Sequence, residues 1–314
     1  MSLAFVFPGQ GSQSVGMGRA LAESFPQAQR VFAEVDDALG QKLSAIMFDG
    51  PEGELTLTAN AQPALMAVSI AVLRVLEAEA GLDLARDAAF IAGHSLGEYS
   101  ALAAAGTFTL ADTARLLRLR GDAMQKAVAV GEGAMAALLG LDYETGVAVA
   151  AEAAQGQVCQ IANDNGGGQV VASGNKAAVE RAMEIAKAHG AKRAILLPVS
   201  APFHCALMQP AADAMARALA GVVMRAPCVP VVANVLAAPI TDPEDIRRRL
   251  VEQVTGTVRW RESIAYMAHE GVDSFYELGA GKVLSGLVKR IAATATGTAV
   301  NSPADIEAYR SRQS

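Results

Sequence analysis

A serine between two glycines, in the stretch G-H-S-L-G at residues 93–97, is the first feature of this 314-residue sequence that could do chemistry. The apolar run 88–92 before it is typical of a strand, and the Ala-rich run after it, up to Gly106, is typical of a helix. On such a strand-to-helix turn, the helix N-terminus stabilises a negative charge that develops at the hydroxyl. A serine that only caps the helix would not need both glycines, so the pattern predicts that Ser95 is a nucleophile.

A serine hydroxyl needs a base, and the sequence contains four histidines. His94 adjoins Ser95 and is expected to be part of the turn, while His189 and His269 fall at the ends of expected helices. His204 follows the apolar run RAILLPV in a proline-containing loop, where α/β folds concentrate catalytic groups. We therefore expect His204 to be the base.

The acid of a catalytic triad, which orients the histidine, is harder to find. Asp164, in the stretch ANDNGGG, is the one loop acid between Ser95 and His204 with a favourable setting. It falls in the middle segment of the chain rather than at the end of a main-sheet strand. A backbone carbonyl can also hold the imidazole tautomer, so the sequence leaves both arrangements open.

An arginine falls on the apolar face of the expected helix 110–127. At about 100° per residue, Arg120 points with the leucines and Met124 rather than with the other charged side chains. A buried guanidinium needs an anionic partner, and its planar fork suits a carboxylate. Gly121 costs about 1 kcal/mol in a helix interior relative to alanine and is expected to clear room beside the arginine. This pattern favours a ligand carboxylate as the partner of Arg120, with a structural salt bridge as the alternative.

The composition indicates a globular protein, because 52% of the residues are hydrophobic and 18% are charged. A net charge of -6 without runs of like charge does not suggest a nucleic-acid or acidic-membrane partner. The N-terminus lacks the features of a signal peptide, and polar residues interrupt the uncharged stretch 55–73, so neither secretion nor a membrane span is expected. Three cysteines without a C-x-x-C spacing predict no disulfide framework and no zinc site, and they fit a reducing cytoplasm.

The order of the expected elements predicts an α/β fold, because apolar runs of strand length alternate with helical stretches over a largely parallel sheet. The middle segment differs, with the order strand, helix, two strands, helix, strand that is typical of ferredoxin-like units. We therefore expect an inserted small subdomain at residues 129–198. Residues 1–128 and 199–314 then form one discontinuous large subdomain.

Six motifs, in order across nearly the whole chain, resemble those of malonyl-CoA:acyl carrier protein transacylases. They are FPGQGSQ, GHSLGEYSALAAAG, LRLRGDAMQ, SAPFHCALM, PVVANV and ELGAGKVLSGLVKRI. The resemblance implies an α/β-hydrolase-like large subdomain around the ferredoxin-like insertion. It also implies transfer of a malonyl group from malonyl-CoA through a Ser95 ester to the phosphopantetheine thiol of acyl carrier protein, for fatty acid biosynthesis. No metal or other cofactor, a cytoplasmic location and a monomer are part of the same expectation.

The resemblance also assigns roles to single residues. It implies that Ser95 and His204 form a catalytic dyad and that Arg120 binds the malonyl carboxylate. The other implied site residues are Gln10 and Leu96 as the oxyanion hole, Gln253 as the residue whose main-chain carbonyl orients the histidine, and Phe203, Asn163 and Asn165 as substrate-binding residues. The two asparagines have turn formation as an alternative role. Lys282, Lys289 and Arg290 are candidates for a basic patch that meets the acidic carrier protein.

Other functions stay open at this point. A serine hydrolase or thioesterase would share the serine and the histidine, but it predicts a carboxylate beside His204 and gives no reason for an inward Arg120. A malonyltransferase of a malonate decarboxylase or polyketide system would share every motif. A nucleotide-binding module is disfavoured, because neither GQGSQSVGMG nor NGGGQVVASG has both the spacing and the strand-to-helix setting of a phosphate-binding loop.

Overall fold

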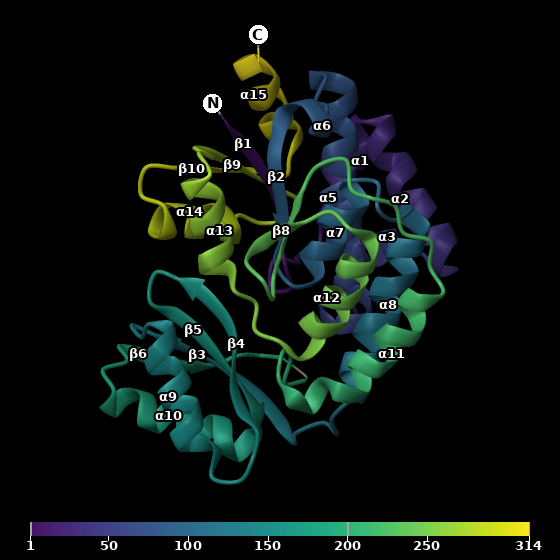
Figure 1. The fold of residues 1–314 in the computed structure, drawn as a ribbon. Coiled ribbons are helices and arrows are strands. Elements are labelled where there is room, and N and C mark those ends of the chain that lie inside the picture. The colour runs from purple at the N-terminus through teal and green to yellow at the C-terminus, as the bar shows by residue number, and fades with distance from the viewer. Residues whose placement is uncertain (1, 200, 314) are drawn as a thin grey trace.

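The computed structural model describes residues 2–199 and 201–313, which form two sheets covered by helices (Figure 1). Sheet A has six strands in the order β10-β9-β1-β2-β7-β8, and sheet B has four in the order β4-β5-β3-β6. In Figure 1, sheet B and its helices lie at the lower left, while the two ends of the chain lie together at the opposite end of the molecule.

Sheet A is mostly parallel, with β1 at its centre. Its strands are β1 (Leu3–Phe7), β2 (Ala88–Gly93), β7 (Val231–Ala233), β8 (Ala238–Ile240), β9 (Ser274–Leu278) and β10 (Thr296–Val300), and β8 alone among these described strands is antiparallel. The apolar pattern of the sequence predicts four of these six strands. It misses β8, which is only three residues long, and β10, whose sequence TGTAV is not an apolar run.

Helices pack on both faces of sheet A, because successive side chains of a strand point to opposite faces. Phe5 and Phe7 of β1 pack in the larger apolar cluster with α5 and α7, whereas Ala4 and Val6 pack in a second cluster with α13 and α14. The helices of this part of the chain are α1 (Arg19–Ser24), α2 (Pro26–Leu39), α3 (Leu43–Asp49), α4 (Glu52–Thr56), α5 (Thr58–Ala80), α6 (Leu84–Asp87), α7 (Leu96–Ala104), α8 (Leu110–Lys126), the 3-10 turn η1 (Ala206–Met208), α11 (Gln209–Ala220), α12 (Pro243–Thr255), α13 (Trp260–His269), α14 (Val283–Ile291) and α15 (Pro303–Gln313).

Helix α5 is the one helix in the described ranges that is long and apolar enough to cross a membrane. In the structure, 89% of its most apolar window is buried inside the protein. It packs against α2, α7 and α8, and it therefore belongs to the core of the fold.

Sheet B is antiparallel and carries the order β-α-β-β-α-β. Its elements are β3 (Gly133–Leu139), α9 (Tyr143–Ala154), β4 (Cys159–Gly166), β5 (Gln169–Asn175), α10 (Lys176–Ala188) and β6 (Arg193–Leu196). These strands and helices bury an apolar cluster of their own, which includes Leu138, Val149 and Val179. The predicted α/β class, with a mostly parallel sheet and a ferredoxin-like unit, is confirmed. The subdomain limits at residues 129 and 198 stay a prediction.

Candidate active site

The turn between β2 and α7 holds Ser95 in a strained conformation. Its φ is 54° and its ψ is -112°, a region that residues with a side chain rarely adopt. A Cβ on Gly93 would lie 1.9 Å from the carbonyl carbon and oxygen of Gly97. A Cβ on Gly97 would lie 2.2 Å from the carbonyl oxygen of Phe7. Both glycines are therefore needed for strand β1, strand β2 and helix α7 to meet at this point.

A histidine lies within hydrogen-bonding distance of the serine. Oγ of Ser95 is 2.7 Å from Nε2 of His204, and Nδ1 of His204 is 2.8 Å from the main-chain carbonyl oxygen of Gln253. Because a carbonyl only accepts, Nδ1 carries the proton and Nε2 is free to accept one from the hydroxyl. Burial, helped by the positive charge of Arg120, lowers the pKa of His204 to about 3, so the ring is neutral at neutral pH.

The other candidate for orienting the histidine lies elsewhere. The carboxylate of Asp164, on β4, pairs with Arg261 of α13, with Oδ2 2.8 Å from Nε. Of the two arrangements that the sequence left open, the carbonyl of Gln253 is therefore the one found at His204.

Arg120 reaches the serine from helix α8. Its side chain is buried, and its Nη2 donates to Oγ of Ser95 at 3.1 Å and to Oε1 of Gln253 at 2.9 Å. Its Nη1 donates to Oε1 of Gln62 at 2.9 Å, and its Nε has no hydrogen-bond partner in the described chain. All of these acceptors are neutral. Among the described residues, no carboxylate bonded directly to the guanidinium offsets its charge, which is the requirement for binding an anionic group.

Gly121 makes a different contact from the one that the sequence suggested. A Cβ at this position would lie 2.6 Å from the carbonyl oxygen of Thr58 and 2.7 Å from Cα of Ala59. The glycine therefore makes room for the first turn of α5 rather than for the guanidinium. Close packing of α8 on α5 brings Arg120 within reach of Gln62, which α5 carries.

A cavity of about 710 Å³ opens over the serine and is lined by residues of helices α4, α5, α7 and α8, of strands β3 and β4 in sheet B, and of the loops beside them. The predicted site residues that line it are Ser95, His204, Arg120, Gln10, Leu96, Asn163 and Phe203. Leu96 is the first residue of α7, so its backbone N–H has no partner within the helix. Gln253 lies behind this lining, fully buried between Arg120 and His204.

Asn165 differs from its neighbour Asn163. Its Oδ1 lies 2.9 Å from Nε2 of His94, whose ring packs against Trp260 with the ring centroids 5.6 Å apart. Asn165 therefore holds the histidine of the turn before α7, whereas Asn163 faces the cavity. His94 is half-buried, lines the cavity and is part of the turn, as its position beside Ser95 predicts.

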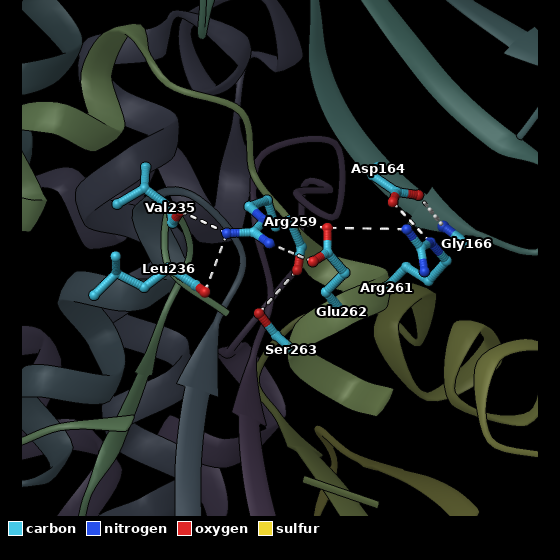
Figure 2. Close-up of polar contacts among 8 residues, drawn as sticks. All are labelled: Asp164, Gly166, Val235, Leu236, Arg259, Arg261, Glu262 and Ser263. Carbon is cyan, nitrogen blue, oxygen red and sulfur yellow. Dashed lines mark hydrogen bonds and ion pairs between the residues drawn. The ribbon is translucent and has the colours of Figure 1, made fainter. Parts of the chain in front are cut away.

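Strand β4, which carries both asparagines, is fixed to the segment before α13. The backbone N–H of Asp164 donates to the carbonyl of Val258 at 3.0 Å. Figure 2 shows the side-chain contacts that continue this link: Arg261 pairs with Asp164, Glu262 lies between Arg261 and Arg259, and Arg259 donates to the carbonyls of Val235 and Leu236. The chain of contacts thus runs from β4 to the turn that follows β7.

Three buried residues at the site were not predicted from the sequence: Gln62, Glu98 and Asn234. Asn234 holds the turn, because its Oδ1 accepts the N–H of Ser95 at 2.7 Å and its Nδ2 donates to the carbonyl of Gly93 at 2.7 Å. For two of these residues, the sequence contains a feature that could have indicated a role at the site. Asn234 ends the apolar run PVVA, and Glu98 is the one charge in the helical stretch LGEYSALAAA. The sequence around Gln62 offers no comparable signal.

The fold and the site are those of an acyltransferase. The sequence model of the acyl transferase domain family matches residues 4–301, so the chain belongs to this family. The malonyl CoA-acyl carrier protein transacylase of Escherichia coli strain K12 is 50% identical over 305 residues, which are 97% of each chain. The protein of the same name from Bacillus subtilis strain 168 is 49% identical over 306 residues, 97% of this chain and 95% of that one. The family resemblance found in the sequence is confirmed.

Solved structures give the same family. The acyl-carrier-protein-S-malonyltransferase of Bartonella henselae is 59% identical, with a TM-score of 0.97 over 100% of this chain and 99% of that one. A malonyl-transacylase solved in complex with a type II PKS acyl-carrier protein is 46% identical, with a TM-score of 0.96 over 99% of this chain and 100% of that one.

Proposed function

We propose that this chain transfers the malonyl group of malonyl-CoA to acyl carrier protein in two half-reactions that share Ser95. The observation that carries the proposal is the position of the Arg120 guanidinium, which lies 3.1 Å from Oγ of Ser95 and, within residues 2–199 and 201–313, is hydrogen-bonded only to neutral acceptors. An acyl group with a second, free carboxylate would pair with this cation and bring its thioester carbonyl to the serine.

In the first half-reaction, Oγ of Ser95 attacks the thioester carbon while Nε2 of His204 takes the hydroxyl proton. The backbone N–H groups of Gln10 and Leu96 stabilise the oxyanion of the tetrahedral intermediate. The carbon–sulfur bond then breaks, His204 gives its proton to the departing sulfur, and CoA leaves as a thiol. The malonyl group remains as an ester of Ser95.

The second half-reaction reverses these roles. The phosphopantetheine thiol of acyl carrier protein enters the same cavity, and His204 takes its proton as the sulfur attacks the ester. The carbon–oxygen bond breaks, and His204 returns the proton to Oγ of Ser95. The proposed cycle uses side chains and backbone groups of the chain itself, without a metal or redox cofactor.

The alternative of a serine hydrolase is not favoured, because Nδ1 of His204 meets a carbonyl and not a carboxylate, and because hydrolysis gives Arg120 no role.

We also propose that the malonyl product supplies fatty acid biosynthesis in the cytoplasm and that the enzyme is a monomer. We propose that residues 129–198 form a small subdomain beside the cavity. Lys282, Lys289 and Arg290, on and before α14, are our candidates for the basic patch that meets the carrier protein.

The test of this function is intact-protein mass spectrometry after brief mixing with malonyl-CoA. We expect the wild type to gain one malonyl group and to lose it when acyl carrier protein is added, and we expect Ser95→Ala to gain none. Ser100→Ala is the matched control, because Ser100 is a buried serine of helix α7, which follows Ser95, and its hydroxyl has no hydrogen-bond partner in the described chain. Release of CoA without any gain of mass on the wild type would mean hydrolysis instead of transfer.

A further inference from the structure

Helix α7 carries a buried carboxyl group that the mechanism above does not use. Glu98 is 1% exposed and lies three residues after Ser95, in the first turn of the helix. An acidic residue at this position often turns back to the N–H of the residue that precedes the helix. Here that N–H, of Ser95, donates to Oδ1 of Asn234 instead. The carboxylate of Glu98 is therefore directed elsewhere.

One carboxylate oxygen of Glu98 accepts hydrogen bonds from Gln253 and Asn234, the two residues that hold the backbone of Ser95. Its Oε2 accepts from Nε2 of Gln253 at 2.8 Å and from the backbone N–H of Asn234 at 3.1 Å. Asn234 accepts the N–H of Ser95, and Nε2 of Gln253 also donates to the carbonyl of Ser95 at 3.0 Å. Both backbone groups of the strained serine are thus held by residues that meet at Glu98.

The carboxylate also contributes to which way the side-chain amide of Gln253 faces. A primary amide presents a donor on one side and an acceptor on the other, and a carboxylate can only accept. With its NH₂ group bound to Glu98, Gln253 presents Oε1 to Nη2 of Arg120 at 2.9 Å. The opposite orientation would set an NH₂ group against the guanidinium. Glu98 and the carbonyl of Ser95, which accepts from the same NH₂ group, therefore fix an acceptor beside Arg120.

In its ionised form, Glu98 also places a negative charge near Arg120 without occupying its N–H groups. Burial raises the pKa of Glu98 to about 7, while the hydrogen bonds from Asn234 and Gln253 and the charge of Arg120 oppose this shift. The charge of Glu98 likewise opposes the lowering of the Arg120 pKa by burial. Because Gln253 lies between Glu98 and Arg120, the carboxylate stabilises the charged form of the buried guanidinium but leaves it free to bind a ligand.

We propose that Glu98 is a positioning residue for acyl selectivity: through the amide of Gln253, it fixes the guanidinium of Arg120 in the orientation that binds the free carboxylate of the acyl group. The inference rests on the proposed function and deepens it. It assigns the preference for acyl groups with a free carboxylate to a chain of three side chains, Glu98, Gln253 and Arg120, instead of to the arginine alone.

The test compares malonyl-CoA with acetyl-CoA, which lacks the free carboxylate. The ratio of their kcat/KM values for loading is measured in wild type, Glu98→Gln, Gln253→Met and the double variant. Gln253→Met keeps the main-chain carbonyl that meets His204 and removes only the amide. We expect each single variant to lower the malonyl-to-acetyl ratio about tenfold, the effect of losing one hydrogen bond to a charged group. We expect the double variant to lose no more than the larger single loss, because both changes break the same chain of contacts.

Glu277 provides the matched control. It is another fully buried glutamate, on strand β9, and its carboxylate accepts the N–H groups of Leu284 and Ser285 at the start of α14. None of these three residues is among those that line the cavity. Glu277→Gln is expected to lower stability and to leave the ratio unchanged. If Glu98→Gln does not fold, Glu98→Asp takes its place, since it keeps the charge and withdraws the oxygen from Gln253 by one methylene group.

The outcomes separate the inference from the function on which it rests. Equal losses for both substrates in Glu98→Gln, with the ratio unchanged, would mean that Glu98 is merely structural. Additive losses of the ratio in the double variant would mean that it does not act through Gln253. Either result overturns the inference while wild-type loading stands. Failure of the wild type to load malonyl-CoA would instead overturn the proposed function.

Discussion

The guanidinium of Arg120 donates a hydrogen bond to the hydroxyl of Ser95, with Nη2 3.1 Å from Oγ. The cation expected to bind the substrate thus lies in contact with the group expected to react with it. After burial, its charge is the largest cause of the low pKa of His204, which lies 2.7 Å from the same hydroxyl. A bound carboxylate would offset this charge, so substrate binding and the basicity of the histidine are coupled.

This coupling predicts an unusual pH dependence. A histidine with a lowered pKa gains its proton only at low pH, so the free enzyme stays active as the pH falls through 6.5 and loses its base only near pH 3. We therefore expect kcat/KM for malonyl loading to show no loss from His204 between about pH 5 and 8. In kcat, which reports the substrate complex, the apparent pKa is expected to be higher with malonyl-CoA than with acetyl-CoA, because only malonyl-CoA offsets the charge of Arg120.

The check is a pair of pH–rate profiles for the two substrates. They are measured in Glu98→Gln as well, because burial raises the pKa of Glu98 to about 7 and its titration falls in the same range. A step at pH 6.5 in kcat/KM that persists in Glu98→Gln would contradict the lowered pKa of His204.

Replacing Arg120 tests the carboxylate contact itself. Arg120→Ala is expected to lower kcat/KM for malonyl-CoA by about 100-fold, the cost of removing one partner from a buried charge pair, and to affect acetyl-CoA far less. Arg120→Lys keeps the charge but loses the planar fork, so it should fall between the two. The measurement is the loading rate with each substrate.

Arg118→Ala is the control on the same helix, since Arg118 is only half-buried and does not line the cavity. Its malonyl-to-acetyl ratio should match that of the wild type. Equal losses for both substrates in Arg120→Ala would assign the arginine to the scaffold instead of to the substrate.

Gly121 is predicted to be required for the packing of α8 on α5. In Gly121→Ala the new methyl group would meet backbone atoms at 2.6 and 2.7 Å, so we expect a loss of about 1–3 kcal/mol in the free energy of unfolding. Gly286→Ala is the opposite case in helix α14, where a Cβ meets nothing within 4 Å, and it should stabilise by about 0.4–1 kcal/mol. Denaturant unfolding measures both, and a neutral Gly121→Ala would show that the two helices can separate without cost.

The ion pair between Asp164 and Arg261 is predicted to fasten β4, and with it Asn163, at the cavity. Asp164 is 2% exposed but Arg261 is 39% exposed, so we expect a coupling free energy of about 1 kcal/mol between Asp164→Asn and Arg261→Met. The two single variants should also raise KM for malonyl-CoA more than they lower kcat, because the serine and histidine are untouched.

A double-mutant cycle measured by denaturant unfolding gives the coupling. The exposed pair Glu184 and Lys187, on helix α10, serves as the reference and should show almost none. A coupling at Asp164 and Arg261 no larger than this reference would mean that the backbone contact with Val258 alone holds β4.

Much of this site was predictable from residue types and short spacings. The glycines at positions 93 and 97 indicate the turn around Ser95, and the lone loop histidine indicates His204. Arg120 falls on the apolar face of its expected helix, and this position indicates a buried cation. Each of these signals lies within one strand, helix or turn, and local backbone sterics and hydrophobic periodicity determine them.

Only the tertiary structure decided which polar groups meet. The side-chain amide of Gln253 forms hydrogen bonds with Arg120, 133 residues away in the sequence, and with Glu98, 155 residues away. Its main-chain carbonyl contacts His204. No spacing in the sequence encodes these contacts, because they depend on how α12, α8 and α7 pack around the end of sheet A. The same holds for Gly121, whose neighbour proved to be another helix. The sequence by itself determined the reactive groups, and long-range packing determined the partners that orient them.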